Sequence, residues 1–408
     1  MLEQTKTAKL NFKDYLVLIH IGTVLMPIAA QIIHTYLLVF LVCFLNLIFC
    51  IDIMGKLKGE SAWCFLALLL PIALTFFEGV TKGQLSIIFL YRILINTLLI
   101  FMGLYYTLIA SKERAKKVFM IAIGMLVVTS ITSIVVLATD PLAARIMATI
   151  GDSADSYAVS MNMRNLGGFS IVYLCVGILS FFLYMAKQKE HRKIVWIGSI
   201  ILISIYIFMA SYTTAILIGF LSIIFTLFGA RAKKQSTVIV SFLFVGLLIF
   251  FFRYQIADLF YELSDATVDI VSNRLKYLAD SIYGIDSNSD AQTRVDYYQK
   301  AWQSFLSSPL IGGEWLGTAK TSGHSYILDM MAKYGLFGLL VLFLEYKAIY
   351  KLFYRTYKRE KTYYYSMLSF AVCIALALLN PSENFFLLLV FLPMGLKAMA
   401  QEEPREET

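Results

Sequence analysis

Long apolar blocks separated by short basic stretches constrain this chain more than any other feature. The 408 residues have a mean hydropathy of +0.73 and only 15% of them are charged, whereas about 25% are charged in an average soluble protein. Segments that cross a bilayer must satisfy every backbone polar group internally, which helices do. The sequence therefore predicts an all-α integral membrane protein in which residues 1–408 form a single polytopic domain.

Reading the sequence in windows of about 19 residues predicts about twelve membrane spans. They lie near residues 14–31, 35–54, 62–78, 85–110, 118–138, 166–186, 193–210, 212–229, 236–252, 324–346, 363–380 and 383–399. The first block follows three lysines and resembles a signal peptide, but the charge pattern of the loops requires it as a span. Spans seven and eight are nearly fused, so eleven or thirteen spans remain open.

The basic residues fall on alternate loops and predict the orientation. About 22 of the 35 Lys and Arg residues lie at the N-terminus or in the loops after spans two, four, six, eight and ten. The short loops after spans one, three and five hold only Lys82, Arg145 and Arg164. The positive-inside rule then puts both termini in the cytoplasm and residues 253–323 outside it. This pattern explains the net charge of +8 without a nucleic-acid partner.

The segment 253–323 is the only sizeable polar part of the chain. Mixed apolar periodicity predicts short helices over Tyr254–Leu263 and Ala266–Ile282, and Asp290 is a suitable cap for a clearer helix over Ala291–Ser307. An apolar stripe on that third helix comprises Val295, Tyr298, Trp302 and Phe305. A stretch with four glycines then leads to His324 at the start of span ten.

The cysteines and the motif content argue against several chemistries. All five cysteines lie inside apolar blocks without metal-ligand spacing, so we expect neither a disulfide nor a zinc site. No phosphate-binding glycine loop and no carboxylate cluster is evident. We expect a protein with no metal and no cofactor.

His324 is the best-placed candidate general base. A cap at Thr321 or Ser322 would put it in the first turn of span ten, where the helix dipole keeps an imidazole neutral. A neutral imidazole at a wet surface can accept a proton from a hydroxyl group. The alternative is an ordinary interfacial histidine.

Three arginines are candidate ligands for phosphate, which a guanidinium binds in a bidentate manner. Arg294 lies in the first turn of the third polar helix, where an ion pair with Asp290 is the alternative. Arg164 precedes Gly167 and Gly168, which would allow a ligand close to the backbone or simply start a helix. Arg92 lies in the outer half of span four, either facing a wet cavity or extending to the headgroups.

Two further acidic positions have simpler interpretations. Asp329 and Lys333 are spaced i, i+4, which predicts an ion pair on span ten. Glu383 lies in the tight turn between spans eleven and twelve, where it would line the same outer cavity or be a solvated turn residue.

Together these residues resemble the O-antigen ligase and O-antigen/capsule polymerase superfamily. The resemblance rests on Arg294, Trp302, Pro309-Leu310-Ile311-Gly312, His324-Ser325 and, nine residues later, Gly335-Leu336-Phe337-Gly338. It covers about 50 residues closely, and the predicted spans and long outward loop agree with it over the whole chain.

The resemblance implies a GT-C-like, metal-independent glycosyltransferase of the bacterial cytoplasmic membrane that takes glycan from a polyprenyl (undecaprenyl) diphosphate. In that case His324 would be the base and Arg294 a diphosphate clamp, with Arg164 and Arg92 as weaker candidates for a second clamp. Ser325 and Glu383 complete the candidate substrate-binding set. Flippase and chain-length regulator proteins are the implied partners.

One departure separates the functions within the superfamily. Many ligases carry an arginine in a Thr-x-[Ser/Thr]-Arg stretch near mid-chain, whereas this chain has Ala210-Ser211-Tyr212-Thr213-Thr214-Ala215. The absence favours a repeat-unit polymerase of O-antigen, capsule or exopolysaccharide over a ligase that moves finished glycan onto a lipid or wall acceptor. A lipid-linked glycan transporter is the alternative of another class, and it would predict inverted repeats and interrupted helices.

Overall fold

The computed structural model describes residues 9–150, 155–188, 193–228, 244, 246, 248, 251–266, 269–283, 290–315, 317–380 and 384–400. The chain is an all-α integral membrane protein. Seven of the described helices are long and apolar enough to cross a membrane, and three shorter apolar helices accompany them. The ninth predicted span, 236–252, lies almost entirely outside the described residues.

The helices follow the predicted apolar blocks closely. In the N-terminal half they are α1 Phe12–Leu25, α2 Pro27–Ile32, α3 Thr35–Met54, α4 Glu60–Thr81, α5 Ile87–Leu104 with the π-helical η1 Tyr105–Ile109, α6 Lys112–Thr139, α7 Ala143–Ile150 and α8 Ser156–Met163. The rest are α9 Phe169–Lys187, α10 Lys193–Ala210, α11 Thr213–Phe228, α13 Arg253–Asp265, α14 Asp269–Tyr283, α15 Asp290–Ser307, α16 Tyr326–Ile349, η3 Tyr350–Tyr354, η4 Arg355–Tyr357, α17 Tyr363–Leu379, η5 Phe386–Phe391 and α18 Leu392–Met399.

Helix α9 forms the centre of the bundle. It contacts α10, α11 and α17, and 78% of its span-like window is buried. Gly177 allows this packing, because a Cβ atom there would lie 2.1 Å from the side chain of Leu387. A helix that is apolar all round is expected in such a central position.

The first predicted span is two helices rather than one, and polar side chains form hydrogen bonds with the backbone at the break between them. Met26 separates α1 from α2, with Pro27 at the first position of α2. Thr129 on α6 donates a hydrogen bond to the carbonyl of Leu25, and the Asn165 side chain accepts one from the amide of Ile28. Backbone groups freed at a break inside a membrane protein need such partners.

Spans seven and eight are separate helices, α10 and α11. Ser211 between them is fully buried and adopts a left-handed backbone conformation with φ of 59°. A residue in the left-handed conformation ends a helix, because the backbone cannot continue the right-handed helical path through it.

The polar segment contains the three predicted helices, here α13, α14 and α15. Their bounds agree with the predicted ones within three residues. The predicted stripe on α15 is only partly correct. Phe305 is 9% exposed, but Trp302 is 46% exposed, and the buried face is completed by Ala301 and Ser304.

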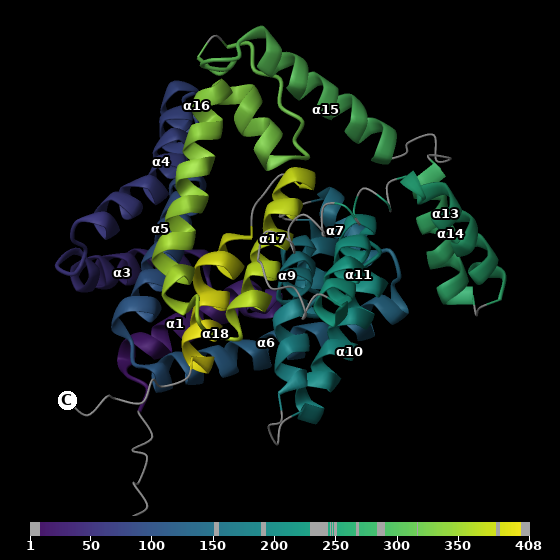
Figure 1. Cartoon of the computed structure of the whole chain (residues 1–408), viewed down its shortest axis with the longest axis horizontal. Coiled ribbons are helices and arrows are strands. Elements are labelled where there is room, and N and C mark those ends of the chain that lie inside the picture. Colours follow the sequence, from purple (N-terminus) through teal and green to yellow (C-terminus); the bar gives the residue numbers. More distant parts are fainter. Residues whose placement is uncertain are drawn as a thin grey trace, which may run out of the picture.

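Helix α16 is broken at Gly335, where φ is 63° and ψ is −145°. Figure 1 shows that the chain rises through residues 326–334, turns at the end of α15 and descends through the long second part. The tenth predicted span is therefore a short half-helix followed by a long helix. We call residues 326–334 the half-helix, residues 322–325 at its start the tip, and the turn at Gly335 the corner.

Candidate functional site

The tip is held by a dense set of hydrogen bonds. The carboxylate of Asp329 accepts hydrogen bonds from the amide and hydroxyl of Ser322, at 2.6 and 2.7 Å, and from the amide of Gly323. The Ser322 oxygen in turn accepts from the amides of His324 and Ser325, both at 3.0 Å. Charge-assisted bonds of this kind are about twice as strong as neutral ones, so Asp329 fixes the backbone that carries His324.

These contacts correct two predictions. The cap of α16 is Ser325, whose side chain accepts from the amide of Leu328, so His324 lies just before the helix instead of in its first turn. Asp329 forms no ion pair with Lys333, because its carboxylate is committed to the tip. Lys333 instead binds Glu78 on α4, at 2.9 Å.

His324 is half-buried and lies against α15. Its ring centroid is 5.3 Å from that of Tyr297, and its carbonyl accepts a hydrogen bond from the hydroxyl of Tyr298 at 3.3 Å. The same hydroxyl lies 3.4 Å from the carbonyl of Leu379 at the end of α17. Helix α15 therefore joins the tip to α17 and sets the position of the imidazole.

The corner explains why the Pro-Leu-x-Gly and Gly-x-x-Gly motifs occur together. The amide of Leu336 donates to the carbonyl of Pro309 at 2.7 Å, and the amide of Gly313 donates to the carbonyl of Ala332 at 2.9 Å. A Cβ atom on Gly335 would lie 2.6 Å from the Pro309 oxygen. The loop after α15 thus satisfies the backbone groups that the break in α16 exposes.

Paired charges surround the corner. Lys82 at the end of α4 binds Glu78 at 2.8 Å and Glu314 at 2.7 Å, while Lys333 also binds Glu78. Burial opposes the charged form of Lys82, but its hydrogen bonds to Glu314 and Glu78 outweigh burial and raise its pKa. The two acidic and two basic side chains together carry no net charge, as is expected where charges stabilise the structure and do not bind a ligand.

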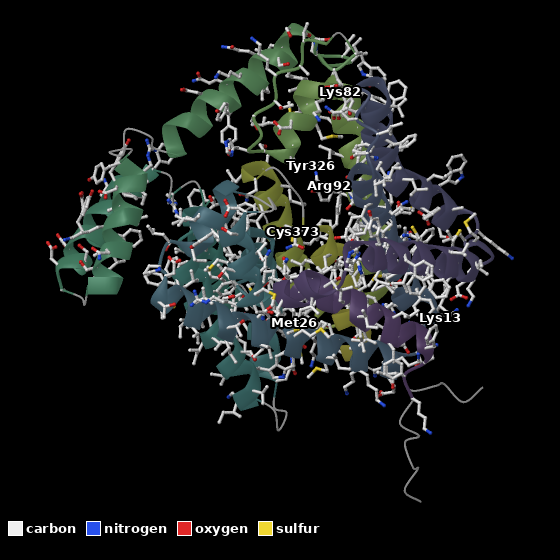
Figure 2. All side chains as sticks on the ribbon, turned by 180° about the vertical axis from the view of Figure 1, so that it is seen from behind. Lys13, Met26, Lys82, Arg92, Tyr326 and Cys373 are labelled. Atoms are coloured by element: carbon white, nitrogen blue, oxygen red, sulfur yellow. The ribbon has the colours of Figure 1, made fainter. Side chains whose placement is uncertain are left out.

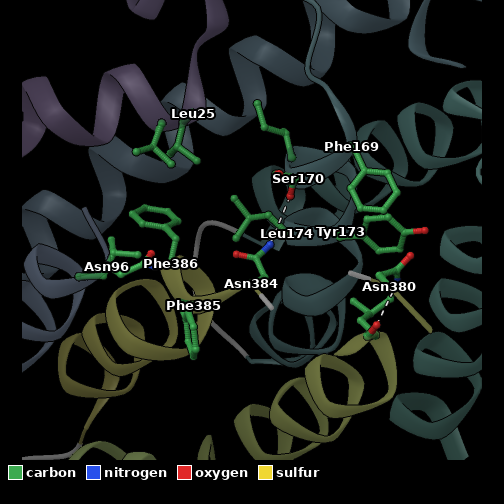
Figure 3. Close-up of a pocket in the computed structure, with 14 residues that line it drawn as sticks. Leu25, Asn96, Phe169, Ser170, Tyr173, Leu174, Asn380, Asn384, Phe385 and Phe386 are labelled. Carbon is green, nitrogen blue, oxygen red and sulfur yellow. Dashed lines mark hydrogen bonds between the residues drawn. The ribbon is translucent and has the colours of Figure 1, made fainter. Parts of the chain in front are cut away.

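A pocket of about 180 Å³ lies beside the tip. The amide of Tyr326, two residues after His324, donates to the carbonyl of Asn380 at 2.7 Å, and Asn380 is one of the residues that line the pocket. Figure 3 shows Asn96 on one side of this pocket, Tyr173 and Asn380 on the other, and Asn384 between them. The pocket brings together the ends of α1, α9 and α17 with α5 and η5.

Arg92 lies one helical turn before Asn96 on α5, so both side chains project from the same face. Arg92 is exposed and has no hydrogen-bond or ion-pair partner among the described residues. Figure 2 places Arg92 and Tyr326 at similar heights in the molecule, well below Lys82. That Arg92 faces a wet cavity stays a prediction.

Arg164 caps the C-terminal end of α8, five residues before the pocket residue Phe169. Its guanidinium donates a hydrogen bond to the Thr139 hydroxyl at 2.9 Å, and it is exposed. The chain runs from it through Gly167 to the pocket residue Phe169. Gly167 is packed against the Tyr206 hydroxyl, which would lie 2.3 Å from a Cβ atom there, so its backbone meets protein and not a ligand.

The other predicted site residues are placed less fully. Ser325 is fully buried and acts as a helix cap, so its contact with substrate stays a prediction. The backbone of Arg294 belongs to α15, but its side chain lies outside the described part of the chain, as does Glu383. The described residues include no group of three or more His, Cys, Asp or Glu side chains that could hold a metal.

Sequence reasoning missed the amide side chains of the pocket. Asn96 interrupts an apolar block, and a polar residue inside a span is a known signal of function. The same signal marks Asn46, however, whose amide only donates to the carbonyls of Val42 and Leu94. Position in the fold, which the sequence does not reveal, separates these two asparagines.

Comparison with known families adds an independent observation. Residues 199–343, about a third of the chain, match the family described as O-Antigen ligase. The matched segment runs from α10 to the second part of α16, and it includes α15, the tip and the corner. The predicted resemblance is confirmed, and the chain is a membrane protein of the glycan ligase or polymerase type. No curated protein matches the chain.

Proposed function

We propose that the chain is a polysaccharide repeat-unit polymerase at the outer face of the bacterial cytoplasmic membrane. It transfers the growing glycan from a polyprenyl diphosphate to the terminal sugar of another lipid-linked unit. The observation that carries the proposal is the fixed tip: hydrogen bonds hold the backbone of His324 beside a pocket. Arg92, which has no ion-pair partner among the described residues, lies one helical turn before the pocket residue Asn96.

The chemistry follows from these groups. The His324 imidazole accepts the proton of an acceptor hydroxyl, and the oxygen attacks the anomeric carbon of the donor sugar. The bond between that carbon and the diphosphate oxygen breaks, and polyprenyl diphosphate leaves. Arg92 neutralises the charge that develops on the leaving group, and Arg294 and Arg164 are the further candidates for this task.

The region around Tyr212 supports polymerase over ligase. The stretch in which many ligases have an arginine here presents Tyr212, whose hydroxyl donates to the carbonyl of Ala144 at 2.7 Å. Its ring packs against Phe169 and Tyr173, two residues of the pocket wall. In this stretch an aromatic side chain packs behind the pocket wall, and no arginine is present.

The interruption of α16 is a feature that a transporter also predicts. In transporters the free backbone groups of a broken helix bind the cargo, whereas here the loop 309–314 occupies groups on both sides of the break. This difference favours the enzyme.

Purified full-length protein and lipid-linked repeat units, without nucleotide, test the proposal. Products of two or more repeats are expected, and their absence would refute polymerase activity. Deletion of the gene separates the two enzymes, because loss of a polymerase leaves single-repeat products whereas loss of a ligase leaves long chains unattached. Accumulation of lipid-linked glycan in vesicles without any transfer would support the transporter.

A further inference from the structure

The pocket beside the tip has the composition of a site for one uncharged sugar ring. We infer that it binds the donor sugar that is attached directly to the diphosphate, and that this sugar carries no carboxylate. The inference rests on the proposed function and adds a specificity to it.

The polar side chains of the pocket are three amides and the hydroxyl-bearing Ser170 and Tyr173. Asn96, Asn380 and Asn384 reach it from α5, from the end of α17 and from the turn before η5. An amide carries both a donor and an acceptor, as does a sugar hydroxyl, so the two match in either direction. None of the described residues that line the pocket carries a charge, so these residues offer an anionic sugar no compensating cation.

Two of these amides are free to bind a ligand. The Asn96 side chain is exposed and makes no hydrogen bond with the described residues. Asn380 donates its NH2 group to the carbonyl of Leu376, which leaves its amide oxygen for a partner in the pocket. Asn384, in contrast, donates to the carbonyl of Ser170 and accepts from the amide of Leu387, so it mainly shapes the wall.

The remaining walls are apolar and aromatic. Phe169 and Tyr173 pack together with a centroid distance of 4.4 Å on one side, and Phe385 and Phe386 line another. Such walls suit the apolar C–H faces of a sugar ring, while a few placed polar groups fix its orientation. A volume of about 180 Å³ is below the 300–1,000 Å³ of typical ligand pockets, which indicates one ring and not a chain.

The position of the pocket indicates which sugar it holds. Arg92 lies one turn outward from Asn96 on the same face of α5. His324 is connected to the pocket through Tyr326, whose amide donates to the carbonyl of the pocket residue Asn380. A diphosphate at Arg92 puts the first sugar at Asn96, in the pocket that Asn380 connects to the half-helix.

Binding measurements on the purified full chain in lipid nanodiscs test the inference. The probes are polyprenyl diphosphate without sugar, the same lipid with one neutral hexose, and the same lipid with one hexuronic acid. We expect the neutral sugar to improve Kd about tenfold, which corresponds to about one net hydrogen bond, and the uronic acid to give no gain.

Variants separate the sugar site from the phosphate site. Asn96→Leu should remove the gain from the sugar and leave affinity for the sugar-free lipid unchanged. Thr97→Val is the matched control, since among the described residues the Thr97 hydroxyl bonds only to Ile93 on its own helix, and it should retain the full gain. Arg92→Gln should weaken binding of all three lipids.

The outcomes distinguish a failure of the sugar site from a failure of the proposed function. Equal affinity with and without the neutral sugar, or a gain that survives in Asn96→Leu, would overturn the sugar site while lipid binding upholds the proposed function. Failure of the wild-type protein to bind any of the three lipids would refute the proposed function and the sugar site together.

Discussion

The two ends of the half-helix differ in how their polar groups are used. At the corner, Gly335 and the loop after α15 satisfy each other's backbone, and the charges of Glu78, Lys82, Glu314 and Lys333 pair among themselves. At the tip, the hydrogen bonds fix the backbone around His324, and Arg92 on α5 has no hydrogen-bond or ion-pair partner among the described residues. The comparison separates a scaffold, where charge is neutralised, from the proposed site, where Arg92 is the proposed ligand for a diphosphate.

The strongest test of this comparison is His324→Ala. Removal of a general base typically costs about 10²–10⁴-fold in rate, and we expect elongation of lipid-linked repeats to fall by this factor. The amount of protein in the membrane should not change, because His324 is only half-buried and lies outside the apolar core clusters. His34→Ala is the control, since His34 is an exposed cap of α3. Normal elongation in His324→Ala would remove the catalytic role.

Gly335→Ala tests the scaffold. A side chain at φ of 63° costs about 1–2 kcal/mol, and the Cβ atom would lie 2.6 Å from the Pro309 oxygen. We expect a total loss of stability on the order of 3 kcal/mol, measured by thermal unfolding in detergent and by the amount of protein in the membrane. Gly124→Ala is the matched control, because no atom lies within 4 Å of a Cβ atom there. Equal stability of the two variants would show that the corner tolerates a side chain.

Asp329→Asn should have a smaller effect than His324→Ala and Gly335→Ala. Asparagine keeps one acceptor but loses the charge, so the tip should loosen and kcat should fall about tenfold, or 1.4 kcal/mol, with KM nearly unchanged. Lys333→Gln is informative beside it. If Asp329 and Lys333 acted as an ion pair, both variants would lower kcat alike, whereas the observed contacts predict that only Asp329→Asn does so.

Glu314→Gln should have the smallest effect. The pair with Lys82 is partly exposed, with 40% of the lysine side chain accessible, and such pairs contribute at most about 1 kcal/mol. Because the pKa of Lys82 is raised in the folded state, this contribution is complete at neutral pH and is lost only as the pH rises above the ordinary value of 10.5. Unfolding curves of the wild type and of Glu314→Gln at pH 7 and above pH 10.5 measure this contribution. A loss of stability well above about 1 kcal/mol at pH 7 would contradict the minor role of the pair.

Much of this fold could be predicted because local signals dominate it. Apolar blocks mark the helices, and the bounds of α13, α14 and α15 follow from periodicity and from Asp290 at the start of α15. The spacing of Pro309, Gly312 and Gly335 marks the corner as a sequence motif. Its structural role follows only from the contact between the loop after α15 and the break in α16.

The candidate site depended more on tertiary contacts. Asp329 is four residues from Lys333, and helix geometry alone favours their ion pair. The tip offers Asp329 three donors, and Glu78 lies close enough to bind Lys333, so long-range partners replaced the local one. The pocket unites α5, α9 and α17, and no pattern within one segment reveals that Asn96 and Asn380 face each other.

The central claim is that the tip and corner lie on the side of the membrane away from the cytoplasm. A single cysteine at Leu310, which is 69% exposed at the corner, in a chain whose natural cysteines are replaced, tests it with a membrane-impermeant maleimide on intact cells. Lys358→Cys, in the exposed basic stretch after α16, is the matched probe for the opposite side. The account predicts labelling of Leu310→Cys in intact cells and of Lys358→Cys only after the membrane is permeabilised; the reverse pattern would contradict it.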